Sequence, residues 1–225
     1  MRSVVIAIDG TSACGKGTLA RKLARHYGFA HLDSGALYRL VALGVLDRGA
    51  DPSNPAEAVR SARAIDPAAT ADPRLRSVEV GEAASRVAAI GGVRAAILEF
   101  QRNFAAHPPG GAPGAVIDGR DIGTVIAPDA AAKLFIDARA DVRAQRRWLE
   151  LKEKPAVPLP DFDSVLRDLL ARDERDRSRS VAPLRQADDA ALLDTSDLDI
   201  DAAFAAAFAL VDPKVKAALA ARPRG

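Results

Sequence analysis

The chain has 225 residues, enough to bury the core of one α/β domain, and its 48% hydrophobic and 28% charged content is typical of a globular protein. A formal net charge of +2 is too small to favour a nucleic-acid or membrane partner. Because no leader or bilayer-length apolar run is visible, and one cysteine excludes a disulfide framework, we expect a cytoplasmic protein.

Five short apolar runs predict strands, and helical patterns separate them. The runs are Val4–Ile8, Ala30–Leu32, Ala115–Ile117, Ala132–Ile136 and Ala191–Leu193. This alternation predicts a parallel sheet with helices on both faces. Four of the runs end at an acid, namely Asp9, Asp33, Asp118 and Asp137. These acids should lie at the carboxyl edge of the sheet, where such folds bind ligands.

The first run is followed by the loop Gly10-Thr11-Ser12-Ala13-Cys14-Gly15-Lys16-Gly17-Thr18 and then by a helical pattern through Leu19, Leu23 and Tyr27. Strand, glycine loop and helix are the context of a phosphate-binding loop, in which backbone N–H groups and the helix dipole hold phosphate oxygens. Lys16 supplies a charge for the outer phosphates. The motif predicts a nucleoside triphosphate site, and Cys14 is most simply a small residue that the loop tolerates.

The second run leads into Asp33-Ser34-Gly35-Ala36-Leu37-Tyr38-Arg39. Ser34 is placed to cap a helix through Leu37 and Leu40. The same helix start could instead bind a second anion, with Arg39 one turn further on. The two interpretations do not exclude each other.

Several stretches interrupt the pattern. Asp51–Arg76 is rich in Ala, Pro and Asp without clear periodicity, so we expect an irregular insertion. His107–Gly114 is predicted to be a loop, and Lys154–Pro160, with three prolines, a hinged flap. The tail Ala217–Gly225 is expected to fray.

The third run ends in Asp118-Gly119-Arg120-Asp121. Asp118 occupies the place where phosphate-loop proteins keep an acid that orients Mg²⁺ through water. Arg120 at the sheet edge favours an anionic ligand, although a structural turn with Asp121 is the alternative.

The arginine-rich run Arg172–Arg179 follows the proposed flap. Arg172, Asp176 and Arg179 share one helix face by their spacing. Solvated surface pairs would explain this and contribute about 0.3–0.5 kcal/mol each, whereas a charged hydrogen bond to phosphate contributes about 1.5–3 kcal/mol. We favour closure over phosphates. On the helix before the flap, Arg146 or Arg147 is the candidate for contact with donor phosphates, and at least one of Arg143, Arg146 and Arg147 should be solvated.

No His/Cys metal spacing and no Ser-His-Asp arrangement is present, and the histidines His26, His31 and His107 are scattered. We interpret them as structural or exposed. Transfer of a phosphoryl group to an acceptor that is already an anionic phosphate needs positioning, Mg²⁺ and cations rather than a strong base.

Together these motifs resemble the bacterial cytidylate kinases, of the nucleoside monophosphate kinase family, over nearly the full length. The resemblance rests on Ile8–Gly10 with Gly15–Thr18, Leu32–Arg39, Asp118–Val125 with Pro128–Ala130, and Arg172–Arg179 with Val181–Leu184. It implies Mg²⁺-dependent transfer of the ATP γ-phosphoryl to CMP or dCMP by a monomer. The implied fold is a three-layer P-loop kinase core with a five-stranded parallel sheet, a short acceptor-binding insertion and a mobile lid.

The resemblance also implies one domain, with its core in residues 1–50, 115–152 and 180–211, an acceptor-binding region at 51–114 and the lid with its following helix at 153–179. The implied site residues fall into four groups. The residues implied to hold the monophosphate are Ser34, Arg39, Arg120 and Arg179, and those implied to recognise cytosine are Ser85, Arg94 and Asp121. The residues implied to contact the sugar are Arg172 and Asp176, with Tyr38 alongside. The catalytic candidates are Lys16, Asp118, Arg120 and Arg179. Donor ATP is assigned to residues 10–18 and Arg147, with Mg²⁺ reached through Thr18 or Asp118 by way of water.

Two departures from the family pattern are visible. Thr11, Ala13 and Cys14 stand where the family has other small residues, and a left-handed backbone at Ala13 would cost about 1 kcal/mol. The insertion is also short, although Ser85 and Arg94 lie beyond it. The alternatives are another small-acceptor kinase, acting on UMP or shikimate, and a nucleotide-gated regulatory protein. RNA binding by the arginine run is weaker still because no aromatic residues accompany it.

Overall fold

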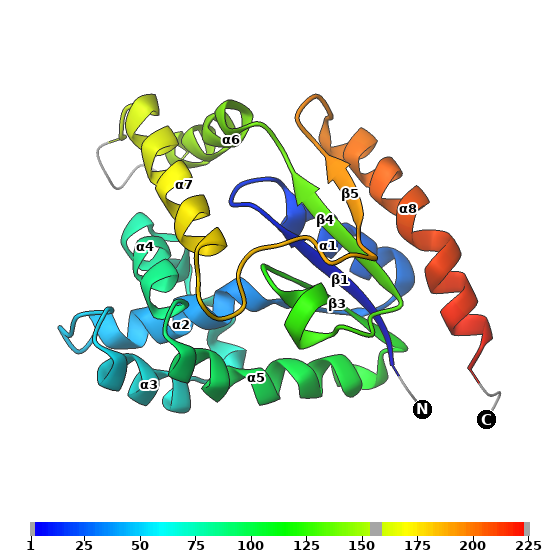
Figure 1. Cartoon of the computed structure of the whole chain (residues 1–225), viewed down its shortest axis with the longest axis horizontal. Coiled ribbons are helices and arrows are strands. Elements are labelled where there is room, and N and C mark those ends of the chain that lie inside the picture. The colour runs from blue at the N-terminus through cyan, green and yellow to red at the C-terminus, as the bar shows by residue number, and fades with distance from the viewer. Residues whose placement is uncertain (1–2, 154–158, 223–225) are drawn as a thin grey trace.

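The computed structural model describes residues 3–153 and 159–222, and its centre is a five-stranded parallel sheet (Figure 1). The strands are β1 (Val4–Gly10), β2 (Ala30–Asp33), β3 (Gly114–Gly119), β4 (Ala132–Asp137) and β5 (Ala191–Asp194). Their spatial order is β2-β3-β1-β4-β5. All five predicted strands are confirmed. The central strands β1, β3 and β4 are buried on both faces and are therefore apolar almost throughout, whereas β2 and β5 are partly exposed edge strands.

The register of the sheet brings the strand-end acids together. Asp33 pairs with Asp118 across β2 and β3, and Asp118 pairs with Ile8 on β1. On the other side of β1, Asp137 of β4 pairs with Asp194 of β5. The predicted gathering of acids at the carboxyl edge is therefore confirmed.

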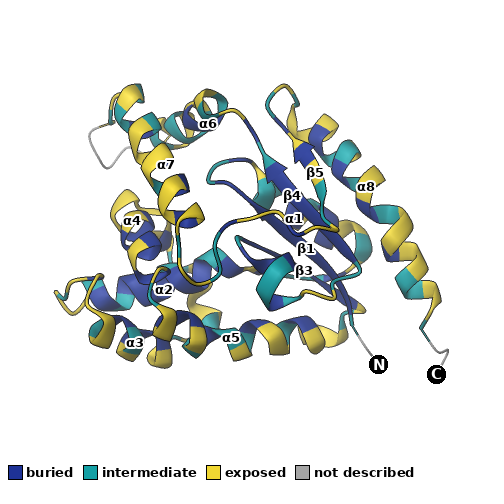
Figure 2. Ribbon diagram, viewed as in Figure 1, coloured by how far each residue is buried: buried dark blue, intermediate teal, exposed yellow. Residues whose placement is uncertain are grey.

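Helices cover both faces of the sheet, which gives three layers. Alternate side chains of β1 enter separate cores: Ile6 and Ile8 pack with α1 (Lys16–Tyr27) and α8 (Ile200–Ala220), whereas Val5 and Ala7 face the other helices. That second layer consists of α2 (Ser34–Leu46), α3 (Pro55–Ala64), α4 (Val78–Val87) and α5 (Gly91–Ala106). Figure 2 shows the central strands β1, β3 and β4 buried between these layers, whereas the edge strand β5 is partly exposed.

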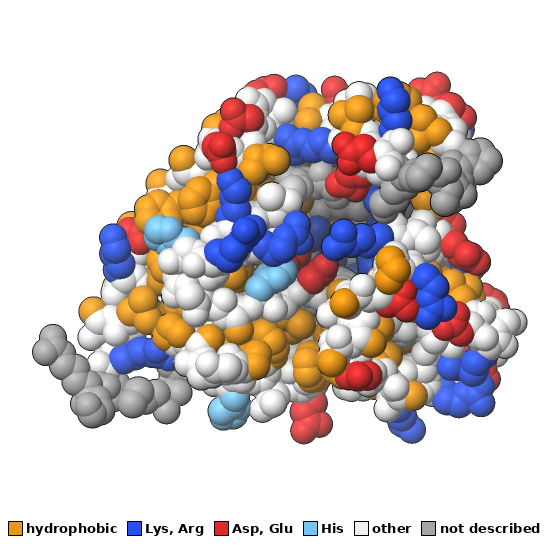
Figure 3. All heavy atoms as spheres, turned by 180° about the vertical axis from the view of Figure 1, so that it is seen from behind, with side chains coloured by type: hydrophobic (Ala, Val, Ile, Leu, Met, Phe, Trp, Pro, Cys, Tyr) orange, Lys and Arg blue, Asp and Glu red, His pale blue; other side chains and the backbone are white. Residues whose placement is uncertain are grey.

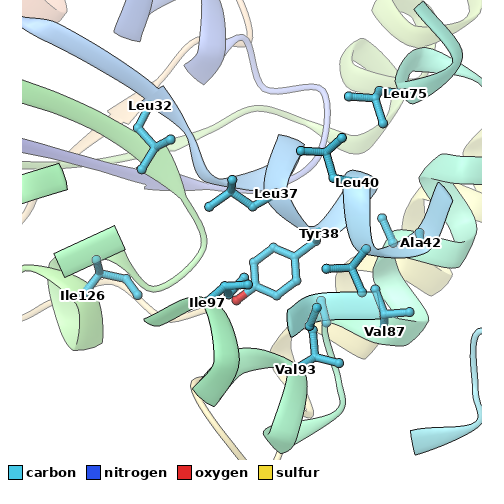
Figure 4. Close-up of a cluster of buried hydrophobic side chains, with 14 of the residues drawn as sticks. Leu32, Leu37, Tyr38, Leu40, Ala42, Leu75, Val87, Val93, Ile97 and Ile126 are labelled. Carbon is cyan, nitrogen blue, oxygen red and sulfur yellow. The ribbon is translucent and has the colours of Figure 1, made fainter. Parts of the chain in front are cut away.

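The largest apolar cluster lies between α2, α4 and α5. Leu37 and Val41 of α2 are fully buried there, as is Val87 of α4, and Ile97 of α5 is nearly so. The ring of Tyr38 lies in the same cluster (Figure 4). This packing fixes the acceptor-side helices on the sheet, so residues on their ends hold a defined position.

The insertion is more ordered than its sequence indicates. Within residues 51–76 the structure contains α3 and two 3₁₀ turns, Pro67–Ala71 and Pro73–Arg76, and no strand. Asn54 caps α3 by accepting hydrogen bonds from the N–H groups of Ala56 and Glu57. The expectation of an irregular segment was wrong over α3, because its buried side consists of Ala58, Ser61 and Ala62. The helical period is therefore carried by Glu57, Arg60 and Arg63 on the outer side rather than by large apolar residues.

The remaining helical elements are a 3₁₀ turn at Pro109–Gly111, a π-helical turn at Ile122–Ile126, α6 (Ala140–Lys152) and α7 (Phe162–Arg177). Helices α6 and α7 pack together beyond the carboxyl end of β4 (Figure 1). Most of the predicted flap, residues 154–158, lies outside the described residues.

The predicted fraying of the tail was wrong for residues 217–220. Helix α8 continues to Ala220, with Pro213 inside it. Val211 and Val215 are fully buried, and Leu219 packs against the same cluster, so tertiary contacts hold this end. No helix in residues 3–153 and 159–222 is long and apolar enough to span a bilayer.

Candidate active site

The phosphate loop joins β1 to α1, and its backbone has three unusual positions. Gly10 approaches β4 so closely that a Cβ there would lie 2.1 Å from the carbonyl oxygen of Ile136. Gly15 has φ of 89° and begins α1, and Ala13 has φ of 59°. The left-handed backbone considered for Ala13 is confirmed. The loop therefore stores strain that glycine at this position would avoid.

Lys16 lies across this loop. Its ammonium donates a hydrogen bond to the carbonyl oxygen of Thr11 at 3.0 Å. Burial, followed by the nearby Arg120 guanidinium, lowers the pKa of Lys16. A desolvated ammonium beside other cations is stabilised by an incoming anion.

The loop opens into a cavity of about 290 Å³ at the carboxyl edge of the sheet. All residues assigned to the acceptor line it, together with Asp118, Arg147 and the loop residues Ser12, Ala13 and Gly15–Thr18. A band of Lys and Arg side chains crosses the hollowed face of the molecule in Figure 3. Of the residues assigned to the donor, Gly10, Thr11 and Cys14 do not line the cavity, because they are the buried residues of the loop.

Three guanidinium groups surround one carboxylate in this cavity. The Nε of Arg120 donates to Asp176 Oδ2 at 2.7 Å, and Arg179 also pairs with Asp176. The Nε atoms of Arg172 and Arg179 are buried without a hydrogen-bond partner. Although burial opposes ionisation, the three arginines together lower the pKa of Asp176. Three cations around one anion leave an excess of positive charge that a dianionic phosphate would neutralise.

A second polar cluster lies deeper, between α2, α4, α5 and the end of β3. Arg94 and Asp121 form a buried ion pair, and the Arg94 guanidinium lies 5.4 Å from the centre of the Tyr38 ring. The Ser85 and Tyr38 hydroxyls are buried without hydrogen-bond partners. Because buried polar groups in proteins are almost always paired, these hydroxyls indicate a polar ligand at this end of the cavity.

Asp9 anchors the turn that carries Arg120 and Asp121. Its two carboxylate oxygens accept hydrogen bonds from the N–H groups of Ile122 at 2.7 Å and Gly123 at 2.8 Å. Burial raises the pKa of Asp9 to about 7. The sequence placed Asp9 at a strand end, but only the structure shows this contact with the π-helical turn.

This raised pKa predicts a pH-dependent stability term. The folded protein holds the Asp9 proton more tightly than the unfolded chain, whose reference pKa is 3.8, so the contribution is full below about pH 4 and is lost as pH rises towards 7. As the pH rises from about 4 to 7, the free energy of unfolding of the wild type should fall relative to that of the Asp9→Asn variant, by up to about 1.4 kcal/mol per pH unit. Urea unfolding at several pH values measures the difference; a constant difference contradicts the prediction.

The predicted role of Ser34 as a helix cap was wrong. Asp33 is the cap, since its side chain accepts from the N–H of Ala36 at 3.2 Å. Ser34 is the first helical residue, and its buried hydroxyl accepts a hydrogen bond from Gln101 of α5 at 2.6 Å. The second expectation for this motif, a helix start that faces an anion site, agrees with the position of Ser34 in the cavity wall.

The arginines of α6 have three different environments. Arg147 lines the cavity and pairs with Glu150 at 3.2 Å. Arg146 donates to the hydroxyl and carbonyl of Thr195, so it holds the segment after β5. Arg143 is buried and pairs with Asp173 of α7. The sequence marks Arg143 only as one of three arginines of which at least one should be solvated, and it does not mark Asp173, because nothing in residue type or spacing separates the two from their charged neighbours.

Of the two candidate Mg²⁺-orienting residues, Thr18 lies in the first turn of α1 and Asp118 lies near the end of β3. His31 lies 2.7 Å from Asp118 Oδ1, so this histidine supports a site residue rather than standing apart from it. The other oxygen of Asp118 would lie 3.6 Å from a Cβ at Gly17, one residue before Thr18. No group of three His, Cys, Asp or Glu side chains in the described part of the chain could hold a metal alone. Few protein ligands suit an ion such as Mg²⁺, which takes its other ligands from water and phosphates.

A phosphate loop that shares a cavity with a second, arginine-lined anion site defines a P-loop kinase. Comparison with known proteins agrees with this class. The family model for cytidylate kinase matches residues 6–212, and the chain belongs to that family.

Two curated relatives are similar along almost their whole length. The cytidylate kinase of Rhodopseudomonas palustris strain BisB18 is 56% identical over 211 residues, which cover 93% of this chain and 96% of the relative. That of Paramagnetospirillum magneticum is 54% identical over 212 residues, covering 94% and 99%.

Solved structures support the fold at lower similarity. An uncharacterized protein from Eubacterium ventriosum has a TM-score of 0.54 and 16% identity, covering 93% of this chain and 99% of that chain. A sugar kinase from Janibacter sp. has a TM-score of 0.50 and 14% identity, covering 98% and 99%. At these identities the likeness concerns the fold alone.

Proposed function

We propose that this kinase transfers the γ-phosphoryl group of ATP to CMP or dCMP, giving CDP or dCDP, as a step of pyrimidine nucleotide metabolism. The observation that carries the proposal is the shared cavity of the phosphate loop and the buried Arg94–Asp121 pair. The names of the relatives support the same acceptor.

The deeper polar cluster suits a cytosine ring. Arginine can donate to the O2 and N3 edge of the base, and a carboxylate can accept from its 4-amino group. Arg94 and Asp121 are assigned these roles, and the unpaired Ser85 hydroxyl supplies a further contact. Uracil carries a carbonyl at position 4, which would face the Asp121 carboxylate without a proton between them.

The acceptor monophosphate is assigned to Ser34, Arg39, Arg120 and Arg179. Arg172 and Asp176, with Tyr38 alongside, are assigned to the sugar. Arg39 donates to the carbonyl oxygen of Leu75 at 2.7 Å, so it also ties this pocket to the 3₁₀ turn of the insertion. The excess of guanidinium groups over carboxylates is the physical basis for this placement.

Donor ATP is assigned to the loop at residues 10–18 and to Arg147. Mg²⁺, held through water near Thr18 and Asp118, would neutralise charge on the donor phosphates. Lys16, Arg120 and Arg179 neutralise the transferring group and hold the two phosphates together. The acceptor oxygen is already anionic, so the proposed transfer needs no general base.

Within one domain, we assign residues 51–114 to acceptor binding and residues 153–179 to a lid that excludes water when both nucleotides are bound. The core then comprises residues 1–50, 115–152 and 180–211. We further propose a cytoplasmic monomer without nucleic-acid partners. The chain has one cysteine and so cannot form an intramolecular disulfide, which is compatible with a reducing compartment.

The proposal is tested by coupled assay of ADP release with ATP and CMP, dCMP, UMP or shikimate as acceptor. We expect turnover with CMP or dCMP in the range of about 1–100 s⁻¹ and much less with the others. Preference for UMP would contradict the base assignment. Turnover with none of the four would contradict the proposed function.

Replacing Arg179 by alanine should weaken CMP binding far more than ATP binding. Loss of a charged hydrogen bond of about 1.5–3 kcal/mol corresponds to about 10- to 150-fold in the dissociation constant for CMP. Titration calorimetry with each nucleotide measures the two effects. Arg60→Ala on the exposed side of α3 is the matched control, and equal losses for both nucleotides in Arg179→Ala would contradict the assignment.

Asp121→Asn should narrow the selectivity for CMP over UMP. The asparagine amide can donate to a uracil carbonyl, which the carboxylate cannot do. We expect the ratio of kcat/KM for CMP to that for UMP to fall at least about tenfold, in keeping with the discrimination that a hydrogen-bonding site provides. The KM for ATP serves as the internal control, and an unchanged ratio removes the base-reading role from Asp121.

A further inference from the structure

A buried ion pair lies behind the phosphate loop. Arg143 of α6 and Asp173 of α7 are 4% and 1% exposed, and Arg143 Nη1 lies 2.6 Å from Asp173 Oδ2. Neither residue lines the cavity at the sheet edge. Buried ion pairs contribute little net stability, because desolvation offsets their attraction. Stability alone is therefore a weak explanation for the Arg143–Asp173 pair, and a role in the phosphate-binding loop is a better one.

The pair holds one residue of the loop from both sides. The N–H of Ser12 donates to Asp173 Oδ1 at 3.4 Å, and the carbonyl oxygen of Ser12 accepts from Arg143 Nη1 at 3.1 Å. Arg143 is itself fixed, since its Nε donates to the carbonyl oxygen of Ala138 at 2.8 Å. Both polar groups of the Ser12 backbone are thus attached to a rigid frame made by α6 and α7.

This attachment acts on the strained position of the loop. The carbonyl group of Ser12 belongs to the peptide plane that precedes Ala13, and the orientation of this plane helps to set φ of Ala13, which is 59°. An L-residue adopts this backbone only where its surroundings impose it. Arg143 supplies that restraint at the peptide in question.

We propose that Arg143 and Asp173 are positioning residues that hold the donor loop in its left-handed conformation at Ala13 and so set its affinity for the triphosphate. The proposal rests on the proposed function only for the identity of the donor. Through Asp173, the restraint also attaches the donor loop to α7, the helix that carries Arg172 and Asp176.

The first test measures dissociation constants of the whole protein for ATP and for CMP separately, by calorimetry. Asp173→Asn should weaken ATP binding at least about tenfold, which is the size of effect expected when a charge-assisted hydrogen bond that holds the loop is lost. CMP binding should change less than about threefold. Arg143→Lys, which keeps the charge but loses the planar fork, should behave in the same way and replaces Asp173→Asn if that variant does not fold.

The second test asks whether the loss arises from strain at Ala13. Glycine adopts the left-handed backbone without this restraint, so Asp173→Asn should cost about fivefold less ATP affinity in the Ala13→Gly background than in the wild type. If the ion pair had a purely structural role, Asp173→Asn and Ala13→Gly would change the dissociation constant for ATP independently of each other. Additivity of the two substitutions, or equal weakening of ATP and CMP binding, overturns the proposal.

The matched control is Asp189→Asn. Asp189 is the partner of the buried Lys133 at 2.8 Å, and neither residue lines the cavity. This variant should lose stability without loss of ATP affinity. A loss as large as that in Asp173→Asn would show general loosening and would overturn the positioning role. If the wild-type protein does not bind ATP, the proposed function is contradicted as well. If the wild type binds ATP and Asp173→Asn binds it with the same dissociation constant, only the positioning role is contradicted.

Discussion

The constraint on which this site depends is an uncompensated positive charge at a sheet edge. Arg120, Arg172 and Arg179 gather around Asp176, and two of their Nε atoms are buried without partners. Such an arrangement costs free energy in the empty protein and is stabilised by a phosphate. The parallel sheet makes it possible, because every strand delivers its following loop to the same side.

The chemistry of the reaction follows from this charge distribution. In the proposed assignment, the donor loop offers backbone N–H groups and Lys16, and the acceptor pocket offers guanidinium groups, so both anions would bind in one cavity. Catalysis by a strong base is unnecessary for a phosphate nucleophile. The base-reading role that we propose falls in a different region, the Arg94–Asp121 pair, which lies beside the apolar cluster of α2, α4 and α5 that Figure 4 shows.

Much of this arrangement could be predicted from sequence, for identifiable reasons. Strands buried on both faces must be apolar, and a phosphate loop needs small residues and a lysine, so both leave clear patterns. Helix α3 lacks large apolar residues on its buried side, which is Ala and Ser, although Asn54 and Pro55 mark its start. The sequence predicts Ser34 as the helix cap, but Asp33 is the cap. The difference arises because α2 begins one residue earlier than the sequence indicates. Arg143 and Asp173 could not be distinguished from their charged neighbours, since their function arises from which loop α6 and α7 meet in space.

The single cysteine of the chain lies inside the donor loop, fully buried, with its sulfur 3.2 Å from the place that a Cβ on Gly10 would occupy. A thiol reagent can reach it only while the loop is open. The rate of its chemical labelling therefore reports how often the loop leaves its folded conformation, and this natural reporter needs no engineered probe. If a bound nucleotide slows the labelling of Cys14, the ratio of the labelling rates without and with nucleotide measures how strongly the nucleotide stabilises the loop.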